Sequence, residues 1–205
     1  ASTGDVIYLN GTNFTAKPGQ TVNINKTITI DGGSQSDPSL KSTLDGKGQN
    51  RIFNITNNAD VTLKNLIFLN GNSTEGGAIY SDGGNVTVSN STFINNTASI
   101  GGAINGVNVT VTDSTFNNNT ATQYGGAISG NIVTVTNSNF TNNKASENGG
   151  SIYSDNGVNV TDSTFNNNAA HNGGAVYSNN GNVTVSGSTF NDTTATGSDG
   201  AGGAI

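Results

Sequence analysis

Most of this chain is a repeat of about two dozen residues. A Gly-Gly-small-aliphatic motif, first seen as GGAI, starts at positions 76, 101, 125, 149, 173 and 202. A second motif, Phe followed three residues later by Asn, recurs in fixed phase with the first, beginning at Phe93, Phe116, Phe140 and Phe165. Two motifs repeating in phase at this period indicate a stack of short structural units.

An alternating apolar and polar segment, such as Val86-Thr87-Val88, separates the two motifs in every repeat. Period-two alternation of β-branched residues is typical of a half-buried strand. Each repeat therefore predicts three short strands, around GGAIY, NVTV and STF. A unit this short cannot bury its own apolar face, so the repeats must stack.

The predicted fold is all-β, a parallel β-helix (β-solenoid) of about 24 residues per coil and roughly eight coils. We expect one continuous solenoid, with irregular N-terminal coils over residues 1–75 and regular GGAI/FxxN coils over residues 76–205. Stacking in register predicts two ladders of identical side chains. The core ladder is Val86, Val88, Phe93, Val109, Val111, Phe116, Val133, Val135, Phe140, Val158, Val160, Phe165, Val183, Val185 and Phe190. The Asn ladder is Asn96, Asn119, Asn143 and Asn168, expected to take left-handed backbone and to satisfy turn amides.

Composition argues against several classes of partner. The chain has 31% hydrophobic residues, a net charge of −6 and no cysteine. Six of its seven basic residues lie at or before Lys64, leaving no basic cluster over most of the chain, so nucleic acid is not an expected partner. No apolar run is long enough to predict a transmembrane segment.

The paired GGAI and FxxN motifs resemble the repeats of chlamydial polymorphic outer-membrane proteins. The whole chain, including INKTITIDGG (residues 24–33), is similar to adhesin-like surface proteins of methanogenic archaea. The resemblance implies a right-handed β-helix displayed outside the cell, in an adhesive role. The repeat departs from the pattern at Ser151, at Val176, and in the missing Asn after Phe68 and Phe190.

Neither a catalytic nor a metal site is expected. Polysaccharide lyases and glycosidases also use β-helices, but that chemistry needs convergent carboxylates. The acids of the repeats, Asp82, Asp113, Asp155 and Asp162, fit turn positions. His171 is the single histidine and no calcium-binding loop motif occurs, so no cofactor is predicted.

The only mixed-charge cluster lies near the N-terminus, and we expect it to be a salt-bridged surface. Its members are Asp31, Asp45, Lys47 and Arg51.

Polar residues of the repeat allow two further interpretations. Outward-facing pairs such as Thr110/Thr112 and Thr134/Thr136 predict two files of hydroxyls, which resemble ice-binding solenoids, although Thr also simply suits an exposed strand position. Many Asn residues begin glycosylation sequons. The candidate N-glycosylation sites are Asn10, Asn13, Asn25, Asn54, Asn72, Asn85, Asn90, Asn95, Asn108, Asn118, Asn139, Asn159, Asn182 and Asn191.

We therefore expect a non-enzymatic, extracellular structural or adhesive protein of the cell surface. The alternatives are a polysaccharide-active enzyme and, less favoured, an ice-binding solenoid. The first partner expected is a second copy stacking head to tail into filaments, or else the remainder of a longer surface protein; cell-surface glycans or proteins of a host are further candidates. The candidate end-to-end interface is Val6, Ile7, Gly202, Gly203, Ala204 and Ile205.

Overall fold

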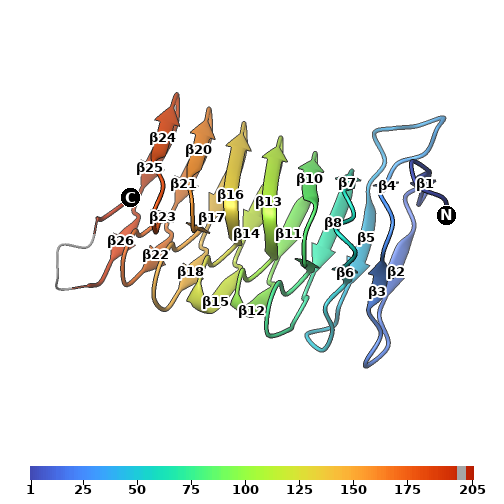
Figure 1. The fold of residues 1–205 in the computed structure, drawn as a ribbon, viewed down its shortest axis with the longest axis horizontal. Helices are drawn as coiled ribbons and strands as arrows, with labels where there is room; N and C mark the ends of the chain where they lie inside the picture. The colour runs from blue at the N-terminus through green and yellow to red at the C-terminus, as the bar shows by residue number, and fades with distance from the viewer. Residues whose placement is uncertain (198–201) are drawn as a thin grey trace.

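The computed structural model describes residues 1–197 and 202–205 and consists of parallel strands wound into one solenoid. Figure 1 shows the coils side by side along a rod, with the N-terminus at one end and the C-terminal coil at the other. The fold is the predicted all-β parallel β-helix, and the eight strands of its second sheet correspond to eight coils.

Two sheets run the length of the rod, and a third covers the coils from Thr97 onward. The first comprises β1 (Val6–Tyr8), β3 (Val22–Ile24), β4 (Ile28–Asp31), β6 (Phe53–Ile55), β7 (Val61–Lys64), β9 (Ile79–Ser81), β10 (Asn85–Ser89), β13 (Ile104–Thr112), β16 (Ile128–Thr136), β19 (Ile152–Ser154), β20 (Val158–Thr161), β23 (Val176–Ser178) and β24 (Val183–Ser186). The second comprises β2 (Asn13–Thr15), β5 (Ser42–Asp45), β8 (Leu66–Leu69), β11 (Thr92–Ile94), β14 (Thr115–Asn117), β17 (Asn139–Thr141), β21 (Thr164–Asn166) and β25 (Thr189–Asn191). The third comprises β12 (Thr97–Ile100), β15 (Thr120–Tyr124), β18 (Lys144–Ala145), β22 (Ala169–Ala170) and β26 (Thr194–Ala195).

The third sheet was not predicted. Its strands follow the Asn ladder, where the sequence offers only short polar segments such as Thr120–Tyr124 instead of an alternating apolar run. One alanine per coil, for example Ala121, is buried beneath this sheet, and Ala121, Ala145 and Ala170 form a small apolar cluster of their own. A narrow corner has room only for a methyl group, which explains the weak hydrophobic signal.

Identical residues stack from coil to coil in the core. Val86 pairs in register with Val61 and Val109, and Val133 pairs with Val109 and Val158. The valines of the core ladder from Val86 to Val160 are at most 1% exposed. The period-two pattern of the sequence therefore sets both which side chains are buried and which strands pair.

The core ladder does not extend through the last coil, contrary to the prediction. Val183 and Phe190 are only partly buried, and Val185 is 37% exposed. These residues keep the register, since Val183 pairs with Val158 and Phe190 with Phe165. They are exposed because, within the described residues, β24 and β25 have a neighbouring coil on one side only.

Glycine pairs close each coil by allowing a very close approach of backbones. Gly125 has a φ of +62°, and its equivalents in the other regular coils share this left-handed conformation. A Cβ on Gly126 would lie 2.1 Å from the carbonyl oxygen of Gly150 in the next coil. A Cβ on Gly125 would likewise lie 2.2 Å from the Ile128 carbonyl oxygen, so both positions require glycine for space.

The Asn ladder is confirmed, but its backbone conformation is not the one predicted. Each ladder amide is buried, and Asn119 Nδ2 donates to Asn143 Oδ1 at 3.0 Å and to the Phe93 carbonyl at 3.1 Å. The left-handed residue is the preceding one: Asn118 has a φ of +56°. The first Asn makes the turn, which frees the second to point into the coil and bond its neighbours.

A ladder of serines was missed altogether. In the turn between the first two sheets, the Ser114 hydroxyl accepts from the Ser91 N–H at 3.1 Å and donates to the Thr112 carbonyl at 2.8 Å. Ser138 and Ser163 repeat this pattern. Left-handed Asp113 and Asp162 precede two of these serines, so the turn role predicted for these two acids is confirmed.

Candidate functional site: a groove across the middle coils

A groove of about 250 Å³ crosses the outside of the first sheet in the middle of the rod. Its floor comes from β13 and β16 and includes Asn105 and Ser129, and its two walls rise at β9 and after β19. We call this feature the central groove. Tyr80, Asn105, Ser129 and Tyr153 occupy the same register position on four neighbouring strands. Three inter-strand spacings separate Tyr80 from Tyr153, so the two wall strands lie about 14 Å apart.

Differences in loop length create the groove. Six residues separate Ile79 from Val86 in one wall coil, whereas only four separate Ile104 from Val109 in the first floor coil. The shorter connection lets each floor coil run straight as one nine-residue strand, visible as the long arrows of β13 and β16 in Figure 1. The wall coils instead turn outward, and each presents the same tripeptide, Tyr-Ser-Asp, at residues 80–82 and 153–155.

Tyr80 forms the first wall and is held by Arg51. The guanidinium carbon of Arg51 lies 4.8 Å from the ring centroid of Tyr80. Arg51 donates to the Glu75 carbonyl at 2.7 and 3.1 Å and to Asn54 Oδ1 at 3.2 Å, so the cation is fixed by several bonds. Burial lowers the Arg51 pKa, against the opposing effect of the nearby Glu75 charge.

The opposite wall is built on a stack of tyrosines. Tyr153 stacks on Tyr124, with ring centroids 4.9 Å apart, and on Tyr177 at 5.9 Å. The Tyr153 hydroxyl donates to Asp155 Oδ1 at 2.9 Å. Burial of the phenol, together with this bond to a carboxylate, raises the Tyr153 pKa well above its usual range. The phenol therefore stays protonated and fixes the Asp155 carboxylate at the rim.

Ser129 lies at the centre of the floor and is 5% exposed. Its neighbour Ile128 points into the core, so Ser129 points outward into the groove. Its side chain lines the groove, where the hydroxyl is placed to contact a polar ligand.

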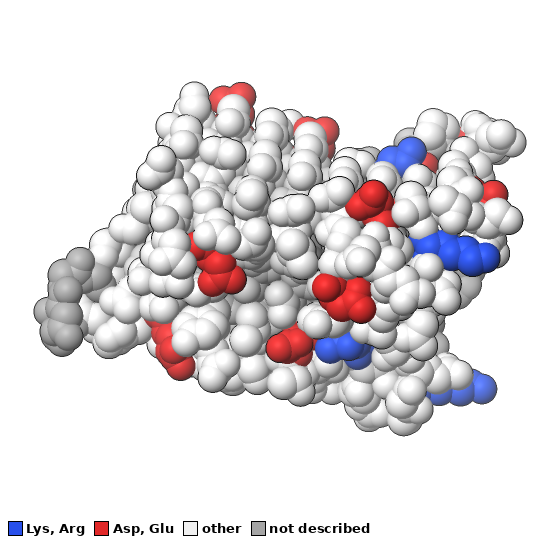
Figure 2. Space-filling model, in the orientation of Figure 1, with Lys and Arg blue, Asp and Glu red and all other residues white. Residues whose placement is uncertain are grey.

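Acidic groups dominate the charge of the groove. Glu75, Asp82 and Asp155 line it, and no Lys, Arg or His among the described residues does so. Figure 2 shows the same polarity over the whole face: basic atoms lie on the N-terminal part of the rod, while acidic groups extend across the middle. Among the described residues, no group of three or more His, Cys, Asp or Glu could hold a metal ion.

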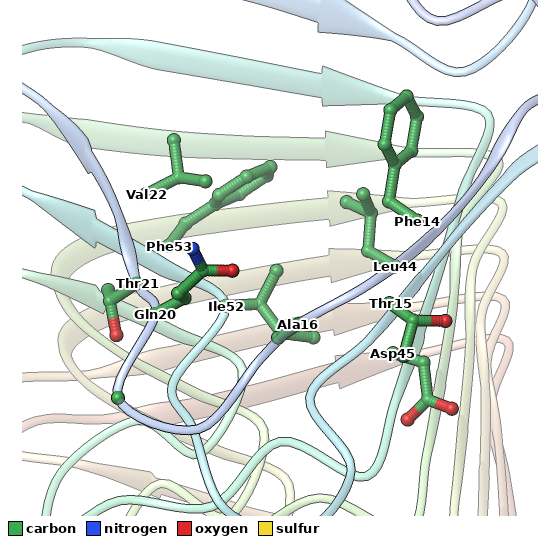
Figure 3. Close-up of a pocket in the computed structure, with 11 residues that line it drawn as sticks. Phe14, Thr15, Ala16, Gln20, Thr21, Val22, Leu44, Asp45, Ile52 and Phe53 are labelled. Atoms are coloured by element: carbon green, nitrogen blue, oxygen red, sulfur yellow. The ribbon is translucent and has the colours of Figure 1, made fainter.

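A larger cavity of about 520 Å³ opens at the N-terminal end of the core. Figure 3 shows Phe14 and Leu44 on one side of it and Val22 with Phe53 on the other. Strands β2 and β3 diverge here, and the segment between them passes over the gap, leaving Phe14 43% and Val22 55% exposed. The cavity is the open edge of the hydrophobic core, since its lining is mainly apolar.

The N-terminal charge cluster is only partly the salt-bridged surface that we expected. Lys47 pairs with Asp45 at 3.0 Å, but Asp31 is buried and pairs with Lys64 at 3.4 Å. Arg51 binds backbone carbonyls and Asn54 instead of a carboxylate, because the coil places it against the wall of the central groove.

The remaining candidate residues lie on the outer surface. The Thr file is in register from Thr62 through Thr87, Thr110 and Thr134, and is interrupted by Asn159. His171 is exposed. Every candidate glycosylation Asn is exposed except Asn54 and Asn108, which are half-buried. None of these residues converges with the central groove.

The candidate end interface is divided between exposed and paired groups. Val6 and Ile205 are each 47% exposed, whereas Ile7 packs against the core. The carbonyl of Ala204 accepts from the N–H groups of Ala175 and Val176 at 2.9 and 3.0 Å, so the last GGAI motif is hydrogen-bonded to the preceding coil.

Sequence reasoning treated Asp82 and Asp155 as unrelated turn acids and missed the groove between them. The sequence does contain a signal for the groove, since IYSDGG at 79–84 and IYSDNG at 152–157 flank two repeats with shortened connections. That signal lies in the differences between repeats and not in their agreement.

The described residues contain no helix that is long and apolar enough to cross a membrane.

Comparison with known families gives one match. A family model described as a right handed beta helix region matches residues 51–204, most of the chain. The searches of curated proteins and of solved structures each gave no match.

Proposed function

The chain belongs to the right-handed β-helix family, and on this premise we propose that it is an extracellular structural and adhesive protein of a cell surface. The observation that carries the proposal is the stack of core and Asn ladders through the regular coils, which makes a stiff rod with a polar exterior. Such a rod holds a binding surface away from the cell.

The resemblance of the repeat to adhesin-like surface proteins supports this role. So does the exposure of the sequons, because a surface protein of an archaeon or a eukaryote carries glycans at accessible Asn residues. The absence of cysteine means that stability outside the cell comes from the ladders and not from disulfides.

Labelling of intact source cells tests the proposal directly. Antibodies raised against the purified rod should decorate unpermeabilised cells, and surface proteolysis should remove the signal. Labelling that appears only after permeabilisation would contradict a surface role. Electron micrographs of the native material would also distinguish single rods from filaments.

A polysaccharide-active enzyme is the second candidate, because Glu75, Asp82 and Asp155 all line the central groove. We favour binding over catalysis, since Asp155 is engaged by the Tyr153 hydroxyl and the groove lining offers no Lys, Arg or His to assist the carboxylates. Release of reducing or unsaturated sugar ends from a polysaccharide panel, abolished by Asp82→Asn, would establish the enzyme instead.

A further inference from the structure

We propose that the central groove is a binding site for non-acidic glycans, with Tyr80 as the stacking platform and Asn105, Ser129, Asp82 and Asp155 as the polar contacts. The inference rests on the adhesive role proposed above and supplies its ligand class.

Tyr80 presents one open ring face to the groove. Arg51 comes from the preceding coil and covers the ring on that side. On the other side the neighbour in register is Asn105, which is much smaller than a tyrosine. A rigid aromatic face beside short polar side chains is the arrangement that receives a pyranose, whose ring faces are apolar and whose edges carry hydroxyls.

The floor supplies polar groups beneath such a ring. Ser129 lines the groove, and its hydroxyl can donate to or accept from a sugar hydroxyl. The Asn105 side chain beside it adds an amide with both a donor and an acceptor. A hydroxyl-rich ligand can form hydrogen bonds with both groups, whereas an apolar ligand would cover them without forming any.

The charge of the groove decides which glycans fit. Glu75, Asp82 and Asp155 accept hydrogen bonds but repel anions. Arg51 lies behind Tyr80, outside the groove lining, and is bonded to backbone carbonyls. Neutral sugars and amino sugars are therefore favoured over uronates, sialylated chains and sulfated chains.

The width limits how much of a glycan is held. Walls on strands about 14 Å apart, around a volume of about 250 Å³, enclose a short section of a chain, which can leave the groove at both open ends. An internal section of a polymer can therefore bind as well as a chain end, which suits attachment to a cell wall or mucus.

A glycan array followed by titration calorimetry tests the proposal on the purified chain. We expect binding to neutral and amino glycans, with acidic glycans of matched length bound at least about tenfold more weakly. Tyr80→Ala should weaken binding about tenfold, and Ser129→Val, which keeps a strand-forming side chain but fills the floor, should weaken it by a similar factor.

The matched control is Tyr8→Ala, which removes an exposed tyrosine of the first sheet outside the groove lining, and should leave affinity unchanged. Thermal melting of each variant verifies folding. An array with no bound glycan, preferential binding of acidic glycans, or equal affinity of Tyr80→Ala and Ser129→Val to the parent would each overturn the proposal. If the wild-type rod still attaches to cells while the array is blank, adhesion stands and only the glycan site is wrong.

Discussion

Phe116 and Phe140 stack face to face in adjacent coils, with ring centroids 4.8 Å apart and ring planes within 1° of parallel. The same contact continues to Phe93 on one side and Phe165 on the other. The spacing equals the distance between neighbouring strands, so the rings stack because the backbones do. Each ring is wholly buried between two others.

Phe140→Asp should therefore unfold the regular coils. The change removes a fully buried ring and places a carboxylate against apolar neighbours above and below, at a cost of at least about 3–5 kcal/mol. We expect Val111→Asp to behave in the same way. The matched control is Thr134→Asp on the outer face, which should melt within a few degrees of the parent by circular dichroism. Equal melting of Phe140→Asp and the parent would disprove the register.

Asn119→Ala should destabilise the rod by about 2–4 kcal/mol, because it leaves the Asn96 N–H and the Phe93 carbonyl without their partners. The control is the adjacent Asn118→Gly, which retains the left-handed conformation of the turn and should be close to neutral. Denaturant titration of both variants measures the difference. A cost for Asn118→Gly as large as for Asn119→Ala would show that the turn, and not the ladder, stabilises the coil.

The sequence predicted the stacking of identical residues. It missed features that leave no hydrophobic pattern or that depend on a neighbouring coil. Val86 over Val109 and Asn96 beside Asn119 followed from identical residues at a constant period. The Ala121 corner was missed because one methyl group per coil produces no hydrophobic pattern. Exposure of Val185 was also missed, because burial depends on a neighbouring coil and not on the residue itself.

The central groove shows the same limit at the level of function. Tyr80 and Asp155 are 75 positions apart, and only the stacking of four coils brings their walls to face one another. Each residue taken alone is an ordinary strand or turn residue. The groove exists because Val107 and Asn131 belong to shortened connections between the two walls.

Asp31 should make the rod sensitive to acid. Burial raises the pKa of its carboxyl, but hydrogen bonds from Asn65 and Gly33 and the charge of Lys64 outweigh burial and hold the pKa below its usual value. A depressed folded-state pKa contributes stability that is present above the unfolded value of about 3.9 and is lost as pH falls through the folded value. Asp31→Asn should thus lower the melting temperature at neutral pH and lose this effect near pH 2. A constant difference at both pH values would contradict the linkage.

Glycan occupancy should follow exposure. In material from an archaeal or eukaryotic surface, we expect exposed turn sites such as Asn72 and Asn95 to be occupied more often than half-buried Asn54 and Asn108. Intact-mass analysis and glycopeptide mapping measure this directly. A native protein with only the 20.7 kDa mass of the polypeptide would show that no site is glycosylated and would contradict the prediction. Preferential occupancy of Asn108 would show that exposure does not determine which sites are glycosylated.

Self-association through the two ends is the last expectation. The 205-residue chain leaves Val6, Phe14 and Val22 exposed on one end coil and Val185 and Ile205 on the other. Parallel strands in a common register can continue across such a contact, and a head-to-tail contact of this kind propagates without closing. We expect the purified chain to sediment as a series of species whose mass increases with concentration. Val22→Lys combined with Val185→Lys should give a single species of monomer mass with an unchanged circular dichroism spectrum, because a charge on each end face opposes stacking. The control is Thr87→Lys combined with Thr134→Lys, which adds two charges on the side of the rod and should leave association unchanged. A parent chain that remains monomeric at the highest concentration would show that the ends do not stack.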